Sequence, residues 1–144
     1  MRYWDPSALV PMIAPESATA TVFGVLEQDR AIVTWWGSSI ECASAVARRG
    51  REGFLEPRAA DVARFRLRLL AAAWTEIEPS EPLRQTAMRL LRTHPLRAAD
   101  ALQLAAAIIA ADGSPETLPF VTRDDRLGQA ASIEGFPVIT PQGG

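Results

Sequence analysis

Short segments rich in β-branched and aromatic residues alternate with longer segments of helical pattern along the whole chain. Five of the short segments are strand candidates, at residues 2–4, 31–36, 74–79, 118–122 and 136–140. The third of them is expected at an edge of the sheet. Strands that alternate with helices form parallel sheets whose two faces the helices cover. The sequence therefore predicts one α/β domain over residues 1–144, with three α/β/α layers and a central parallel sheet of four to five strands.

Proline, glycine and apolar patterning set the expected limits of the helices. Pro6 suits the first turn of a helix after the first strand, and Pro57 begins a long amphipathic helix. The helix that follows the second strand is expected to close at Gly50. A helix is expected at residues 15–26, and residues 101–111 are apolar nearly all round, which predicts a buried central helix.

Four acidic residues lie where a strand or loop ends and a helix begins: Asp5, Glu41, Asp100 and Asp124. In a parallel α/β domain such junctions gather at one edge of the sheet, so residues distant in sequence can share a pocket. Carboxylates gathered without basic partners repel each other unless protons or metal ions relieve the charge. Divalent cations such as Mg²⁺ prefer an all-oxygen environment. The pattern therefore makes a shared divalent-metal site one candidate interpretation.

Helix capping is the structural alternative, and it explains each acid taken singly. Asp5 is placed as an N-cap before Pro6. Ser38 and Glu41 have the spacing of a capping box. Neither position, on its own, distinguishes capping from metal binding.

The two later acids have similar explanations. Asp100 lies in the first turn of its helix, where the macrodipole favours negative charge. Thr122 and Asp125 also have the spacing of a capping box, with Asp124 between them. Asp100, however, interrupts an apolar run, and an unpaired buried carboxylate is costly, so a partner or a metal is expected there.

The chain has one cysteine, one histidine and no lysine. A single cysteine excludes an intramolecular disulfide and a cysteine zinc site, and Cys42 is expected to be a buried thiol. His94 is expected to cap a helix end, which disfavours hydrolysis by a serine or cysteine triad. The lack of lysine disfavours an aspartyl phosphotransfer site. The net charge of −2 argues against broad nonspecific binding of nucleic acid, but it leaves room for a local phosphate site.

No segment has the pattern of a leader or a membrane span. Residues 1–14 are too short and too interrupted by Asp5, Pro6 and Pro11 for a signal peptide. The apolar run near residue 101 is well short of a bilayer span. We therefore expect a cytoplasmic protein without a membrane partner.

The segments YWDPSALV, SSIECASAV, PLRAADALQLAAA and FVTRDDRL, in this order and spacing, resemble the PIN-domain family. They are similar in particular to the VapC toxins of bacterial and archaeal type II toxin–antitoxin systems. The resemblance extends from residue 2 to about residue 140. DALQLAAA and T-x-D-x-R-L together are fairly specific, whereas D-x-S alone would be a weak signal.

The resemblance implies a PIN-like domain with the activity of a Mg²⁺- or Mn²⁺-dependent endoribonuclease. It implies one acidic quartet that serves as catalytic residues and metal ligands: Asp5, Glu41, Asp100 and Asp124. Ser7 and Thr122 match positions where the family often has supporting hydroxyls. Asp124 is preferred over Asp125 because it fills the acidic position of the motif.

The resemblance also implies partners. They are an RNA substrate such as transfer or ribosomal RNA, a cognate protein antitoxin, and often a second copy of the chain. Several arginines are candidate phosphate contacts, with a surface position as the ordinary alternative: Arg48, Arg49, Arg51, Arg123 and Arg126. Of Trp35 and Trp36, at least one is expected in the core. A catalytically inactive PIN-like module for RNA binding or partner docking is the alternative function, and the complete acidic set argues against it.

Overall fold

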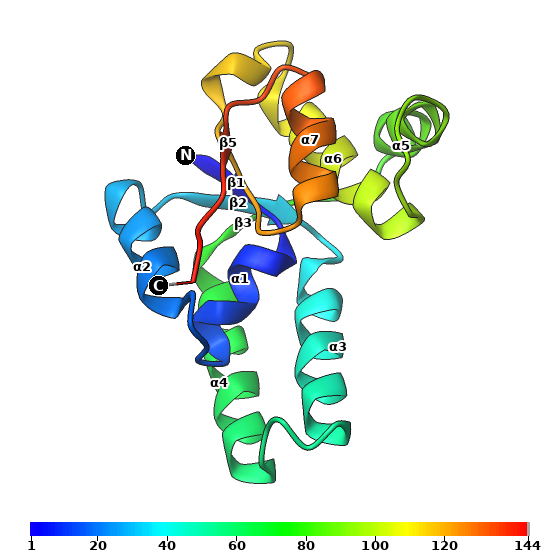
Figure 1. The fold of residues 1–144 in the computed structure, drawn as a ribbon. Coiled ribbons are helices and arrows are strands. Elements are labelled where there is room, and N and C mark those ends of the chain that lie inside the picture. Colours follow the sequence, from blue (N-terminus) through cyan, green and yellow to red (C-terminus); the bar gives the residue numbers. More distant parts are fainter. Residues whose placement is uncertain (144) are drawn as a thin grey trace.

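Five strands form one parallel sheet in the computed structural model, which describes residues 1–143 (Figure 1). Their order across the sheet is β3-β2-β1-β4-β5, and every neighbouring pair is parallel. The strands are β1 (Arg2–Trp4), β2 (Ile32–Trp35), β3 (Thr75–Ile77), β4 (Phe120–Val121) and β5 (Val138–Ile139). The predicted parallel sheet is therefore confirmed, with the third strand at an edge as expected.

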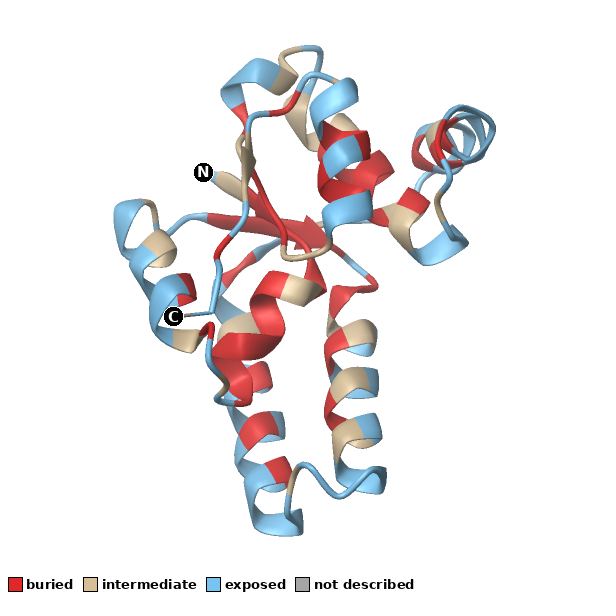
Figure 2. Cartoon of the chain, in the orientation of Figure 1, coloured by how far each residue is buried: buried red, intermediate tan, exposed pale blue. Residues whose placement is uncertain are grey.

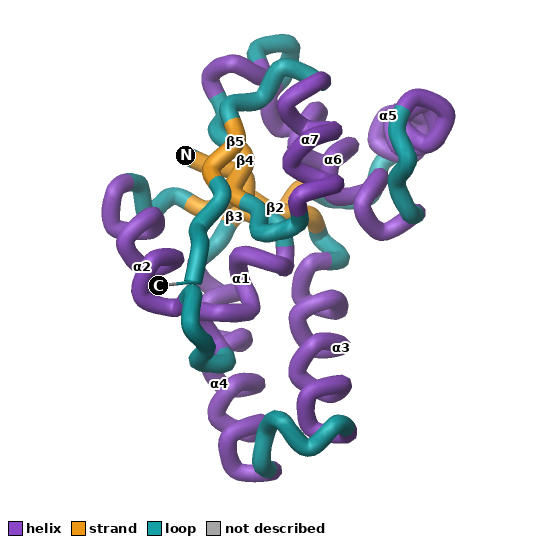
Figure 3. Tube along the Cα trace, viewed as in Figure 1, coloured by secondary structure: helices purple, strands orange, loops and turns teal. Residues whose placement is uncertain are grey.

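Helices cover the sheet on both faces (Figure 3). They are α1 (Pro6–Ile13), α2 (Thr19–Gln28), α3 (Ser38–Arg51), α4 (Pro57–Ala73), α5 (Glu81–Thr93), α6 (Ala98–Ala111) and α7 (Asp125–Ile133), with a 3-10 turn η1 (Pro115–Thr117). The core under α5, α6 and α7 is separate from the core under α1 to α4. The three-layer α/β/α prediction is thus confirmed. Across residues 1–143, each helix is too short or too polar to cross a membrane.

Neighbouring strands β1 and β4 send alternate side chains into the two cores. Tyr3 and Phe120 join the core under α5, α6 and α7, where their rings stack with centroids 5.0 Å apart. Trp4 and Val121 join the opposite core. Because Tyr3, Trp4, Phe120 and Val121 are buried on the two faces of the sheet (Figure 2), they form apolar runs that end at the polar residues Asp5 and Thr122.

Local side-chain chemistry sets the starts of several helices. Pro6 occupies the first turn of α1, as predicted, directly after the N-cap Asp5. The Ser80 hydroxyl caps α5 by accepting a hydrogen bond from the Leu83 N–H at 3.2 Å. The buried central helix predicted at residues 101–111 is α6, which begins earlier, at Ala98.

Two further predicted helix limits also differ from the structure. The α3 helix continues through Gly50 to Arg51, and the chain turns instead at Gly53, whose φ is +80°. The helix predicted at residues 15–26 begins only at Thr19. The Thr19 hydroxyl accepts a hydrogen bond from the Glu16 N–H at 2.9 Å and donates one to the Pro11 carbonyl at 2.7 Å, so the preceding residues form a turn.

Candidate active site

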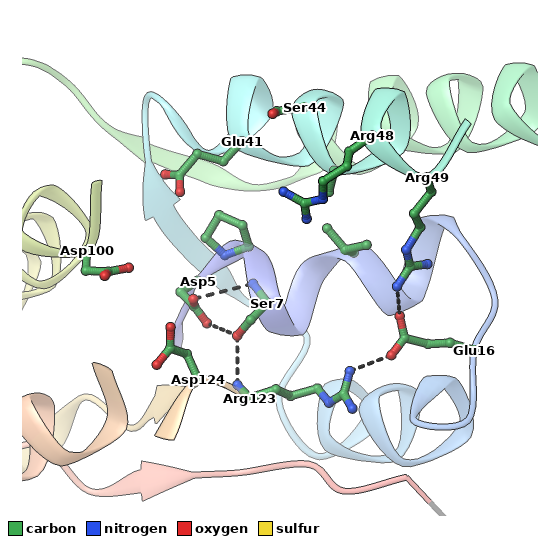
Figure 4. Close-up of a pocket in the computed structure, with 13 residues that line it drawn as sticks. Asp5, Ser7, Glu16, Glu41, Ser44, Arg48, Arg49, Asp100, Arg123 and Asp124 are labelled. Atoms are coloured by element: carbon green, nitrogen blue, oxygen red, sulfur yellow. Dashed lines mark hydrogen bonds and ion pairs between the residues drawn. The ribbon is translucent and has the colours of Figure 1, made fainter. Parts of the chain in front are cut away.

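Four acidic side chains from four elements line one cavity of about 380 Å³ (Figure 4). Asp5 follows β1, Asp124 precedes α7, and Glu41 and Asp100 lie in the first turns of α3 and α6. The first three positions come after the carboxyl ends of β1, β4 and β2, and the start of α6 brings Asp100 to the same edge. The structure thus brings all four candidate residues together.

Asp5 is the most buried of the four, with 5% of its surface exposed. Its carboxylate accepts hydrogen bonds from the Ser7 hydroxyl at 2.8 Å and from the Ser7 N–H at 3.4 Å. The second bond is long, so the predicted N-cap is present but weak. Burial raises the pKa of Asp5 to about 7, and the nearby charge of Asp124 adds to the rise.

The two supporting hydroxyls lie between Asp5 and Asp124. Ser7 Oγ and Thr122 Oγ1 are 3.2 Å apart, and Ser7 Oγ accepts a hydrogen bond from the Arg123 N–H at 2.8 Å. Thr122 Oγ1 accepts one from the Asp124 N–H at 3.0 Å. These bonds connect the start of α1 to the loop before α7 and fix the spacing of the two aspartates.

The predicted capping box of Thr122 and Asp125 does not form. Asp124 itself is the N-cap of α7, because its Oδ1 accepts a hydrogen bond from the Leu127 N–H at 3.0 Å. Capping therefore occupies one oxygen of Asp124 and leaves the other able to face the cavity, which Asp124 lines. Helix capping and a role in the site are compatible at this residue.

Glu41 does not form the predicted capping box with Ser38. The N-cap of α3 is Gly37, and the Ser38 hydroxyl instead lies 2.6 Å from the Thr34 hydroxyl. The Glu41 carboxylate accepts a hydrogen bond from Gln103 Nε2 at 2.6 Å. Glu41 is therefore positioned by a residue of α6 and not by its own helix.

Gln103 is the centre of a buried polar network, with 1% of its surface exposed. Its amide nitrogen donates to Glu41 and, at 3.1 Å, to Ser38 Oγ, while its amide oxygen accepts from the Tyr3 hydroxyl at 2.6 Å. Burial, followed by the charges of Asp5 and Glu41, raises the pKa of Tyr3 well above its ordinary value, so this hydroxyl stays protonated. A donating tyrosine fixes the amide with its NH₂ group towards Glu41.

Burial and mutual repulsion raise the pKa values of three of the acids. The pKa of Glu41 is raised by burial and by the charge of Asp100. The pKa of the half-buried Asp100 is raised by burial and by the charge of Asp124, against smaller opposing effects that include the charges of Arg97 and Arg126. The pKa of Asp5 is raised by the same two effects. The cluster therefore favours the uptake of protons or cations.

The donor set suits a hard divalent cation. The four carboxylates offer oxygen alone, and within residues 1–143 no ion pair joins any of them to an arginine. In the same residues, no three acidic, histidine or cysteine side chains lie close enough to hold one ion. The donor chemistry therefore fits a hard divalent cation, although the spacing of the side chains in residues 1–143 does not define a position for one.

Glu16 was not among the sequence candidates, yet it lines the same cavity. Its two carboxylate oxygens form ion pairs with Arg49 of α3 and with Arg123 of the loop before α7. Arg123 also donates to the Pro141 carbonyl at 3.2 Å. Burial alone would raise the pKa of Glu16, but the two arginines outweigh it and lower that pKa. We refer to Glu16, Arg49 and Arg123 as the Glu16 clamp.

We expect Glu16→Gln to lower the free energy of unfolding by about 1–2 kcal/mol at pH 7, because two partly buried ion pairs are lost. The lowered pKa means that this stabilisation is present above the ordinary value of 4.5 and is lost as the pH falls through the folded value. Urea unfolding at pH 7 and at pH 3 measures both effects. Glu27→Gln, at an exposed residue without an ion pair among residues 1–143, is the control, and an equal loss in both variants would contradict the clamp.

Neither Cys42 nor His94 lines this cavity. Cys42 is fully buried, and burial raises the pKa of its thiol to about 12. His94 is the C-cap of α5, as predicted, and its backbone N–H donates a hydrogen bond to the Leu90 carbonyl. Its imidazole Nε2 lies 2.7 Å from the Glu134 carboxylate. Trp35 is buried, which confirms that at least one of the paired tryptophans belongs to the core.

Residues 3–133 match the PIN domain family, so the chain belongs to this family. PIN domains are generally nucleases. The resemblance identified from the sequence is thereby confirmed for the family as a whole. No curated protein sequence matches the chain significantly.

Three solved structures share the fold. A toxin–antitoxin complex from Klebsiella pneumoniae is 18% identical with a TM-score of 0.62, over 99% of this chain and 98% of that one. A protein from Pyrobaculum aerophilum is 19% identical with a TM-score of 0.63, over 90% of this chain and 84% of that one. FitAcB from Neisseria gonorrhoeae is 19% identical with a TM-score of 0.68, over 98% of both chains. At these identities the likeness is one of fold.

Proposed function

We propose that the chain is a divalent-metal-dependent endoribonuclease that hydrolyses RNA phosphodiester bonds and acts as the toxin of a toxin–antitoxin pair. The observation that carries the proposal is the convergence of Asp5, Glu41, Asp100 and Asp124 on one cavity. The raised pKa values of three of these acids and membership of the PIN family support it.

Asp5, Asp100 and Asp124 would hold Mg²⁺ or Mn²⁺, with Glu41 bound directly or through water. A bound divalent ion polarises a phosphate and makes a water molecule more acidic, which supplies the hydrolytic chemistry without a histidine base. The protein's own residues orient the site. Ser7 and Thr122 hold the spacing of Asp5 and Asp124, and hydrolysis would leave a 5′-phosphate and a 3′-hydroxyl.

Gln103 donates a hydrogen bond to the Glu41 carboxylate, and Glu41 lines the cavity. The similarity to a toxin–antitoxin complex supports a cognate protein antitoxin, and a homodimer is part of the same proposal. The RNA substrate, a transfer or ribosomal RNA, would place its phosphate among the four acids.

Cleavage of total cellular RNA by the purified protein tests the proposal. We expect cleavage with Mg²⁺ or Mn²⁺ and none after EDTA treatment, with activity restored when excess metal is added back. Activity that survives EDTA would contradict the metal-dependent mechanism. RNA binding without cleavage in either metal would favour the inactive binding module instead.

A further inference from the structure

Five arginines border the acidic site, and they fall into two groups. They line the cavity described above or an adjoining hollow of about 640 Å³ that shares Glu41, Asp100 and Asp124 with it: Arg48, Arg49, Arg97, Arg123 and Arg126. Two of them, Arg49 and Arg123, are engaged in the Glu16 clamp. The other three have no ion pair or side-chain hydrogen bond with any residue in the range 1–143.

The unpaired arginines come from three elements around the acids, and all three line the adjoining hollow. Arg48 lies on α3, seven residues or two helical turns after Glu41, so the two side chains share one face of the helix. Arg48 lines both the cavity and the adjoining hollow. Arg97 is the N-cap of α6, three residues before Asp100. Arg126 lies in the first turn of α7, just after Asp124. An extended ligand that passes over the acids would meet guanidinium groups from these elements.

We propose that Arg48, Arg97 and Arg126 bind successive phosphates of an RNA strand that crosses the acidic site, and that Arg49 and Arg123 are structural. This assignment rests on the proposed ribonuclease function. Guanidinium groups match phosphate geometry with paired hydrogen bonds, which a point charge does not. Such contacts offset the repulsion between the phosphates and the carboxylates.

The Glu16 clamp is the reason that neighbouring arginines have different roles. Figure 4 shows Arg48 directed into the cavity without a partner, whereas Arg49, the next residue along α3, meets Glu16 at the far end of it. Arg49 and Arg123 each donate a hydrogen bond from one guanidinium nitrogen to Glu16, which balances part of their positive charge. A phosphate that approached either arginine would also meet the negative charge of the Glu16 carboxylate.

The matched pair Arg48→Gln and Arg49→Gln tests the assignment, because the two positions are adjacent on one helix and lose the same charge. Binding of a fluorescein-labelled, mixed-sequence single-stranded RNA is measured by anisotropy over a range of salt concentrations. Both substitutions are made in an Asp5→Asn background, which prevents cleavage. Melting temperatures of the same proteins, and kcat and KM of the two single variants in Mg²⁺, complete the comparison.

For Arg48→Gln we expect RNA binding weakened about tenfold, a salt slope reduced by about 0.7, and an unchanged melting temperature. Its KM should rise with kcat retained. For Arg49→Gln we expect a melting temperature lowered by about 2–6 °C, with RNA affinity within about threefold of the parent protein. Arg97→Gln and Arg126→Gln should behave like Arg48→Gln.

Equal weakening of RNA binding by both variants, or weaker binding by Arg49→Gln alone, would overturn the assignment. An Arg48→Gln variant that binds RNA as tightly as its parent, or with an unchanged salt slope, would overturn it as well. In each of these cases, metal-dependent cleavage by the wild type would still support the ribonuclease function. A wild type that neither binds nor cleaves RNA would overturn both.

Discussion

Replacing Asp5 with asparagine is expected to lower the rate of RNA cleavage by about 10³-fold or more while the protein stays folded. Asparagine caps a helix nearly as well as aspartate, so the start of α1 should be retained. Its amide cannot supply the anionic oxygen that a hard divalent ion requires. The substitution therefore separates the catalytic role of the residue from its capping role.

The same substitution should increase the stability of the metal-free protein at neutral and alkaline pH. Burial raises the pKa of Asp5 from its ordinary 3.8 to about 7, so between these values the folded protein binds more protons than the unfolded chain does. The wild type therefore loses stability as the pH rises from about 4 to about 7, by up to about 4 kcal/mol. Asparagine cannot ionise and removes this loss.

Urea unfolding in EDTA between pH 4 and pH 8 measures the difference between the two proteins. Asp61→Asn, at an exposed position of α4, is the control and should follow the wild type. Added Mg²⁺ should stabilise the wild type through binding to the folded state, and it should stabilise Asp5→Asn much less. An Asp5→Asn protein that still cleaves RNA, or that is less stable than the wild type at pH 8, would contradict this account of the residue.

The order of strands and helices was predictable because each depends on local chemistry. The aromatic and β-branched segments form strands, and Pro6, Pro57 and Ser80 lie at helix starts, where their side chains favour them. The errors arose where a local signal for a helix end was not used. Gly50 was predicted to close α3, but it remains helical, and the positive φ that turns the chain is found at Gly53.

The positions of the four acids were predictable from the sequence, but their partners were not. Asp5 and Asp124 follow adjacent parallel strands, which is a property of the topology. In contrast, Glu41 bonds to a glutamine 62 residues away, and Glu16 joins arginines 33 and 107 residues away. Local spacing carries no information about such pairs. The one available signal was Gln103 itself, a polar residue in an apolar run.

Gln103→Leu is expected to lower the free energy of unfolding by about 3 kcal/mol and the cleavage rate by about 10–100-fold. Leucine fills a similar volume but leaves the Glu41 carboxylate, the Ser38 hydroxyl and the Tyr3 hydroxyl without the amide that bonds to each of them. Glu41 would then lose the contact that orients it. The activity loss has a different cause from the stability loss, so the two can be separated.

Tyr3→Phe is the matched control, because it removes one hydroxyl from the far side of the same network. We expect about 1–2 kcal/mol of lost stability and a smaller loss of activity, since the Gln103 Nε2 can still donate its hydrogen bond to Glu41. Urea unfolding and initial rates of cleavage measure both quantities in each variant.

A double-mutant cycle with Glu41→Gln decides whether Gln103 acts through Glu41. If it does, Gln103→Leu should have little further effect on cleavage once Glu41 has been replaced, although it should still lower the free energy of unfolding. If the two substitutions multiply their effects on cleavage, the buried amide supports the fold of α6 and has no specific part in orienting Glu41. The buried position of Gln103 and its 2.6 Å contact with Glu41 favour the first outcome.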